Sequence, residues 1–167
     1  MRPRPKVGDV FLIPAGEGNV GLGQVAARYG KDAYFLAVFD GIVAEENAAS
    51  RIRDTLAGEV LFFGLSPDAK FYVGHWQIVS NLPVRADLPL PAYKEAVLSP
   101  DRFDVVDYSG LRRRPATTDE VSKLRFRTIV APIRFERALR ASIGLDPWLP
   151  AYQELKPHKI LSRDVFD

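Results

Sequence analysis

The sequence predicts an α+β fold built mostly from antiparallel strands, and three observations support that class. Runs rich in Val, Phe and Tyr that end at Pro or Gly recur through the first two thirds of the chain, as short strands do. Strand patterns follow one another over residues 57–115, without the alternating helices of a parallel sheet. The clearest amphipathic helix pattern comes late, at residues 131–144.

The first forty residues predict three strands. GDVFLIP (8–14) and AYFLAVFDG (33–41) are rich in β-branched and aromatic residues and end at Pro or Asp-Gly. The segment between them, residues 19–32, fits both strand alternation and helical spacing, so its conformation stays open at this stage. Beyond these, a short helix and two further strands are expected at residues 44–54, 57–65 and 70–80.

Prolines and capping signals organise the second half. Residues 82–93 hold three prolines, which predict an extended surface connector because proline removes a backbone donor. A hairpin is expected over residues 102–116, with Ser109-Gly110 at its turn. Two helices follow: Thr117-x-x-Glu120 is a capping box that opens a short helix through Leu124. Pro132 and Gly144 suit the first position and the stop of the helix at 131–144.

Length and composition limit the class of protein. At 167 residues a single domain over residues 1–167 is expected. The chain has no cysteine, which excludes disulfides, thiol catalysis and cysteine-ligated metals and fits a reducing compartment. It has no run of about 18 apolar residues, which a membrane span needs, and MRPRPKVGD lacks the apolar stretch of a signal peptide. We therefore expect a cytoplasmic protein that does not enter membranes.

The net charge of +2 is unevenly distributed. Residues 111–167 hold 12 basic and 7 acidic side chains, and residues 111–140 hold nine basic and three acidic ones. Such density is compatible with contacts to a phosphate backbone, but it lacks interleaved aromatics for base stacking. A solvated helix face is the favoured interpretation, and a nucleic-acid-binding module using residues 111–140 is the alternative.

A glycine motif raises the question of a nucleotide site. Gly16-x-Gly18-x-x-Gly21 follows a predicted strand, and Asp40 comes nineteen residues later, where a ribose-binding carboxylate belongs. The motif needs a long helix at the glycines to hold the pyrophosphate. Gly23 and a second break at residues 30–32 leave no room for it. We therefore expect a hairpin and no cofactor, and an enzyme built around this loop is the weakest hypothesis.

The remaining candidates for chemistry have simpler explanations. The two histidines, His75 and His158, are 83 positions apart and lack metal-ligand spacing. We expect His75 to be a half-buried strand histidine with a backbone partner. The acids at 101, 104 and 107 alternate between strand faces, so a solvated hairpin is expected there in place of a metal site. No catalytic residue and no metal are predicted.

Several phrases together resemble a known family. In order they are KVGDVFLIP, GLGQV, YFLAVFD, VGHWQIVSNLPV and LRRRPATTDEV. This order is similar to that of the bacterial immunity protein 26 family of polymorphic toxin systems, over about residues 6–145, with residues 146–167 as a C-terminal extension. The resemblance implies an SH3-like curled N-terminal sheet followed by a C-terminal amphipathic helix. It also implies a set of fold determinants: Gly8, Asp9, Pro14, Gly21, Gly23 and Trp76.

The function that this resemblance implies is binding without catalysis. Such a protein neutralises a cognate toxin by occluding its active or binding site. Inhibitors of basic nuclease toxins are usually acidic, because opposite charge speeds capture, and here the acidic stretches are residues 40–46 and 101–107. Arginine-rich segments also anchor protein partners. The candidate partner-binding residues are Asp40, Glu45, Glu46, Asp104, Asp107, Arg112, Arg113 and Arg114.

Overall fold

Two antiparallel sheets and several helices make up the α+β fold, as the sequence predicts. A computed structural model describes residues 4–167. Contacts divide the chain into a first unit, Met1–Leu88 with Ile129–Lys156, and a second unit, Pro89–Thr128 with Pro157–Asp167. Each unit is formed by two segments of the chain, so the division does not follow one boundary in the sequence. The expectation of a single domain stays a prediction.

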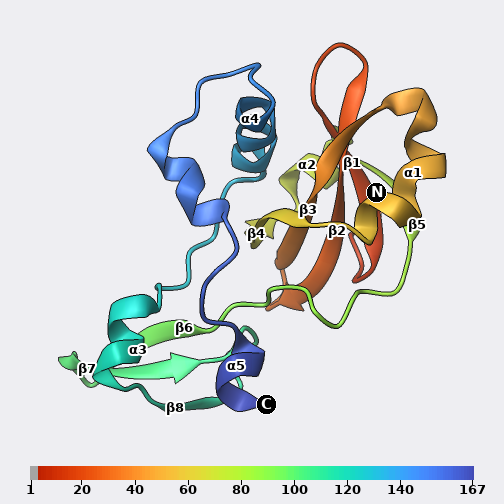
Figure 1. Ribbon diagram of the computed structural model, residues 1–167. Helices are drawn as coiled ribbons and strands as arrows, with labels where there is room; N and C mark the ends of the chain where they lie inside the picture. The colour runs from red at the N-terminus through yellow and green to blue at the C-terminus, as the bar shows by residue number, and fades with distance from the viewer. Residues whose placement is uncertain (1–3) are drawn as a thin grey trace. The chain divides into compact units, whose positions relative to one another are not determined.

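The first unit is organised around a five-stranded sheet in the order β4-β3-β2-β1-β5 (Figure 1). Its strands are β1 (Asp9–Pro14), β2 (Asn19–Tyr29), β3 (Ala33–Ala44), β4 (Val60–Pro67) and β5 (Gln77–Asn81). The first four strands form an antiparallel meander, and β5 returns to pair with β1. The segment at 19–32 that the sequence left open is therefore mostly strand. Register shifts in these ladders bend the strands locally.

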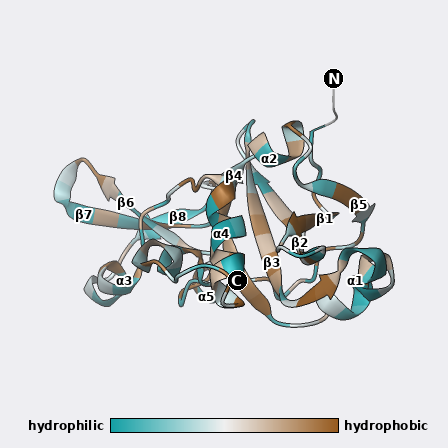
Figure 2. Ribbon diagram, turned by 90° about the horizontal axis from the view of Figure 1, so that it is seen from above, coloured by the Kyte–Doolittle hydropathy of each residue, from teal (hydrophilic) through white to brown (hydrophobic). Residues whose placement is uncertain are grey.

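Helices complete the first unit: α1 (Ala48–Leu56) after a 3₁₀ turn η1 (Glu45–Asn47), α2 (Ala69–Tyr72), α4 (Pro132–Ser142) and a second 3₁₀ helix, η2 (Pro150–Leu155). The predicted helices at 44–54 and 131–144 are confirmed. The predicted strand over 70–80 is wrong in its first half, because a helical turn there buries Phe71 against Phe11, with ring centroids 4.8 Å apart. Figure 2 shows mostly hydrophilic residues on α1.

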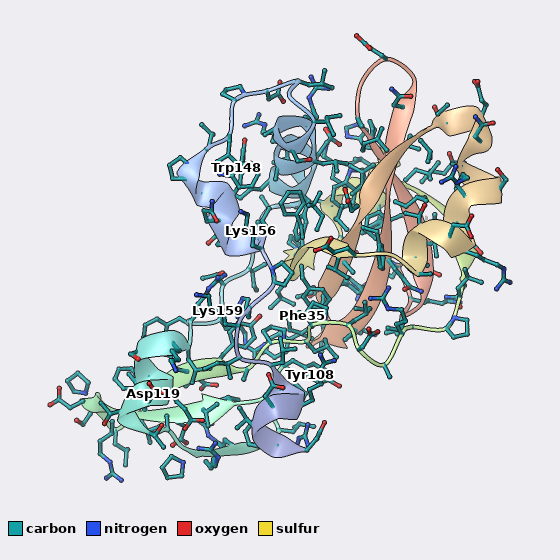
Figure 3. All side chains as sticks on the ribbon, in the orientation of Figure 1. Phe35, Tyr108, Asp119, Trp148, Lys156 and Lys159 are labelled. Carbon is teal, nitrogen blue, oxygen red and sulfur yellow. The ribbon has the colours of Figure 1, made fainter. Side chains whose placement is uncertain are left out.

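Aromatic rings fill the core of the first unit. Trp76 is 1% exposed and stacks on Phe11 with ring centroids 5.2 Å apart. Its indole Nε1–H donates to Glu136 Oε1 on α4 at 3.0 Å, and Lys70 Nζ lies 3.7 Å from the same oxygen. These contacts attach α4 to α2 and to the start of β5. Phe35 on β3 belongs to the same unit (Figure 3).

The second unit holds a three-stranded sheet in the order β6-β7-β8. Its elements are β6 (Tyr93–Val97), β7 (Ser99–Val106), β8 (Arg113–Pro115), α3 (Thr118–Lys123) and α5 (Ser162–Phe166). The β7–β8 hairpin and the capping box, in which Thr117 and Glu120 bond reciprocally, confirm the sequence predictions. Strand β6 is not anticipated by the sequence. Ala92, Val105 and Leu124 form the small core of this unit.

Candidate functional site

The glycine motif forms the β1–β2 hairpin loop. Gly16 and Gly18 have φ of +84° and +74°, a region that favours glycine, and Glu17 between them has φ of +55°. The Ala15 N–H donates to the Asn19 carbonyl at 2.9 Å and closes the loop. Strand β2 follows directly, so the helix that a pyrophosphate site requires does not form at these glycines. The predicted hairpin is confirmed.

A cavity of about 370 Å³ opens beside this loop. The loop residues line it together with Glu45 and with the turn that holds Gly74 and His75. The Glu45 N–H donates to the Gly18 carbonyl at 3.0 Å, which attaches the end of β3 to the hairpin loop. A carboxylate and an imidazole from distant parts of the sequence thus line one cavity.

The expectation for His75 is wrong. It is exposed, and it lies in the turn before β5 and not within a strand. Its Nδ1 is 3.4 Å from Lys70 Nζ, so its partner is a side chain and not the backbone. The physical reason is Gly74, whose φ of +79° reverses the chain after α2 and turns the following residue outward.

The three acidic residues predicted in the first unit are exposed. Asp40 lies at an irregular point of β3, where its N–H donates to the Glu59 carbonyl at 2.9 Å. Glu45 and Glu46 form the first turn of η1. Within residues 4–167 none of the three carboxylates has a basic side chain within ion-pair distance. Among the described residues, no basic side chain neutralises these three charges.

Two large apolar side chains lie exposed next to the Gly74-His75 turn in the chain. Tyr72 is 65% exposed and Val73 is 53% exposed, both just before the turn that lines the cavity. We define the hairpin surface as one set of residues: Glu17, Glu45, Glu46, Tyr72, Val73 and His75. The two apolar members, Tyr72 and Val73, were not predicted as surface residues because residues 70–80 have the composition of a strand. The signal was present in Gly74, which stops the helical turn of α2.

The predicted arginines are already ion-paired within the second unit. Arg112 Nη1 lies 2.7 Å from Asp167 Oδ1, and Arg113 Nε lies 2.9 Å from Asp104 Oδ2. Arg114 contacts Glu120 through both terminal nitrogens, at 2.9 and 2.8 Å. Hydrogen bonding to Arg114, together with the capping bonds, lowers the pKa of Glu120 to about 2.

Asp107 is buried at the centre of the β7–β8 turn. Its carboxylate accepts hydrogen bonds from the Ser109 hydroxyl at 2.9 Å, the Leu111 and Arg112 N–H groups at 3.1 and 3.2 Å, and Arg112 Nε at 3.2 Å. Burial alone would raise the pKa of Asp107, but these hydrogen bonds outweigh it and lower that pKa. The residue shapes the turn, and its side chain presents almost no surface to a partner.

The basic stretch at 111–140 does not lie in one unit. Residues up to Thr128 belong to the second unit and those from Ile129 to the first. On α4, Arg134 pairs with Glu154, and Arg140 Nε lies 2.8 Å from Asp146 Oδ2. Counted by sequence, the first unit holds 13 basic and 13 acidic side chains and the second 10 and 8. Neither unit therefore has the large basic excess typical of a nucleic-acid-binding domain.

The residues that the resemblance names as fold determinants all lie in the first unit. Gly8 has φ of +94°, and buried Asp9 accepts hydrogen bonds from the Lys6 N–H at 2.8 Å and the Asn81 amide at 2.9 Å. Pro14 ends β1. A Cβ at Gly21 would lie 2.5 Å from Leu139 of α4. The remaining two, Gly23 and Trp76, contact Phe11.

The described residues hold neither a metal-binding cluster nor a membrane-spanning helix. Among residues 4–167, no group of three or more His, Asp or Glu side chains is placed to hold a metal ion. In the same part of the chain, no helix has the length and apolar character needed to cross a bilayer. No protein-family model, curated protein or solved structure matches this chain. The family resemblance therefore stays a prediction.

Proposed function

We propose that this is a cytoplasmic, non-enzymatic binding protein that neutralises a cognate toxin by occluding its site, as the resemblance to the immunity protein 26 family implies. The observation that supports this is the hairpin surface: Glu45, which has no ion pair among residues 4–167, lines one cavity with the His75 turn, and exposed Tyr72 and Val73 directly precede that turn. The curled sheet that presents this surface has, in this proposal, SH3-like character.

The composition of the hairpin surface suits a protein partner. Exposed carboxylates without ion pairs attract a basic surface and speed its capture. Tyrosine is enriched among residues that dominate binding energy, because it buries a large area with few rotatable bonds. Tyr72, 65% exposed, provides such an anchor just before the turn that lines the cavity. The surface lies on a hairpin loop and a strand start held by backbone hydrogen bonds, so little ordering is needed on binding.

Nucleic acid is the alternative partner, and the arginines support it less well. Arg112, Arg113 and Arg114 each contact a carboxylate of the second unit. An incoming phosphate would have to displace those carboxylates, which offsets much of the attraction. The proposal therefore places the contact at the carboxylates of the first unit.

The test is capture of the tagged protein's partner from its native lysate at about 0.1 M and about 0.5 M salt, with and without nuclease, because salt screens exposed charges over a Debye length. The informative variant is Glu45→Lys with Glu46→Lys. Its matched control is Asp54→Lys with Asp101→Lys, which changes the net charge equally at two exposed acids outside the hairpin surface.

We expect one protein partner that stays bound at high salt and after nuclease treatment, and we expect co-expression of this protein to protect cells from that partner. The Glu45/Glu46 variant should lose the partner and the control variant should keep it. A nuclease-sensitive partner that dissociates at high salt would overturn the proposal in favour of nucleic acid. Equal loss in both variants would show that net charge, and not the hairpin surface, governs binding.

A further inference from the structure

A second cavity lies within the second unit and has a different character. Its volume is about 280 Å³. The end of α3 and the two residues after it form one wall, and the segment before α5 forms the other. Ala92 lies between the two walls. Its N–H donates to the Ile160 carbonyl at 3.2 Å, and the next residue, Tyr93, forms an isolated β-bridge with Arg125. Backbone hydrogen bonds thus fix both walls.

Three cations line this cavity: Lys123, Arg125 and Lys159. Among residues 4–167, no acidic side chain lines it. Lys123 contacts Asp119, one turn earlier on α3, at 2.9 Å in an exposed pair, and such pairs are weak. Lys159 is exposed and has no ion pair among residues 4–167. Figure 3 shows Asp119 on α3 and Lys159 on the segment that leads into α5.

His158 also lines the cavity, and it contacts Tyr93 edge-to-face with ring centroids 5.4 Å apart. Burial, and then the charge of Arg125, lowers the pKa of His158 to about 4. At neutral pH the imidazole is therefore uncharged and has one N–H to donate.

We propose that this cavity binds the phosphate group of a small phosphorylated molecule. Arg125 offers the planar fork that matches phosphate oxygens, and the two lysines add point charges. A phosphomonoester presents three acceptor oxygens on one centre to these donors, whereas a dicarboxylate of equal charge presents two oxygens at each of two centres. The volume is roughly nine times that of a water molecule in the liquid, which accommodates phosphate and a short ester substituent. This function goes beyond toxin neutralisation and does not depend on it.

The test is NMR titration of the two histidine rings at neutral pH and constant ionic strength. The probes are inorganic phosphate, glycerol 3-phosphate and, as a carboxylate control, succinate. His158 reports on the cavity and His75, in the first unit, is the internal reference. The variant is Lys159→Gln. Its matched control is Arg102→Gln, which removes one exposed charge from β7 of the same unit.

We expect saturable movement of the His158 signal alone, and phosphate affinity about tenfold weaker in Lys159→Gln, as for loss of one charge-assisted hydrogen bond, with Arg102→Gln unchanged. Tighter binding of glycerol 3-phosphate would assign an ester to the site, and equal binding would assign free phosphate. The proposal is overturned if His158 does not respond, if succinate binds as tightly, or if both variants weaken binding equally.

Discussion

Replacing Asp107 by Asn tests whether this residue serves the turn of the second unit. The substitution keeps shape and one acceptor oxygen but removes the charge. Oδ1 receives the N–H groups of Leu111 and Arg112, and an amide oxygen can keep those bonds. Oδ2 receives Arg112 Nε at 3.2 Å. If the Asn NH₂ group takes the place of Oδ2, it faces the Arg112 Nε–H, which is also a donor, and this hydrogen bond is lost.

The expected cost is about 2–4 kcal/mol in the free energy of opening of the β7–β8 hairpin. A hydrogen bond to a charged group contributes about 1.5–3 kcal/mol, and the Ser109 hydroxyl, 2.9 Å from both oxygens, loses one charged acceptor as well. The sum is reduced because the Arg112 side chain is 44% exposed and keeps its contact with Asp167. A loss of this size is large for a unit with such a small apolar core.

Amide hydrogen exchange over residues 99–117 is the assay, since it reports the opening of this hairpin and not that of the first unit. The control is Asp101→Asn at an exposed position of β7. Because folding lowers the pKa of Asp107 from its ordinary value of 3.8, its contribution is complete above about that pH. It is lost as the pH falls through the folded value, so wild type and variant should converge in acid. Equal protection in both variants at neutral pH would refute the reasoning.

Three further substitutions follow from single contacts. Gly23→Ala should cost about 1–3 kcal/mol in urea unfolding followed by tryptophan fluorescence, because the new Cβ would lie 2.4 Å from the buried ring of Phe11. Glu120→Gln should lower the free energy of unfolding by about 1 kcal/mol, a small value because Arg114 is exposed to solvent. Folding lowers the pKa of Glu120 from 4.5 to about 2. The difference in thermal stability between wild type and variant should therefore vanish as the pH falls across that range. Tyr34→Phe should be neutral or stabilising by up to about 1 kcal/mol in the same urea assay, since its buried hydroxyl has no hydrogen-bond partner among residues 4–167.

Elements marked by local chemistry were predictable from the sequence. Pro132 and Gly144 bound α4, and Gly144 has φ of +81°, so the stop signal has a conformational basis. The turn at Ser109-Gly110 joins β7 to β8 because glycine reaches the φ of +81° found there. In each case the residue's own backbone preference decides the structure, and distant contacts are not needed.

Elements decided by tertiary contacts were not predictable. Residues 70–80 have strand composition, yet the helical turn α2 brings Phe71 edge-on to Trp76, with ring centroids 5.5 Å apart. That aromatic packing outweighs local propensity. Strand β6 carries mixed polar and apolar residues, and its conformation comes from pairing with β7. The local sequence pattern does not show which ring Phe71 packs against or which strand pairs with β6.

The candidate site shows the same limit, because a charge count ignores where the opposite charges lie. Residues 111–114 look like a basic cluster, but in the fold their arginines form ion pairs with Asp104, Asp167 and Glu120. Glu45 and Glu46 are an ordinary helix start in the sequence, and the fold leaves both without an ion pair among the described residues. An exposed charge attracts a partner only to the extent that its own chain has not already neutralised it. The hairpin surface is therefore the surface most suited to recognition, although the sequence alone explains Glu45 and Glu46 as an ordinary helix start. The more highly charged segment, residues 111–114, is less suited because its charges are already paired.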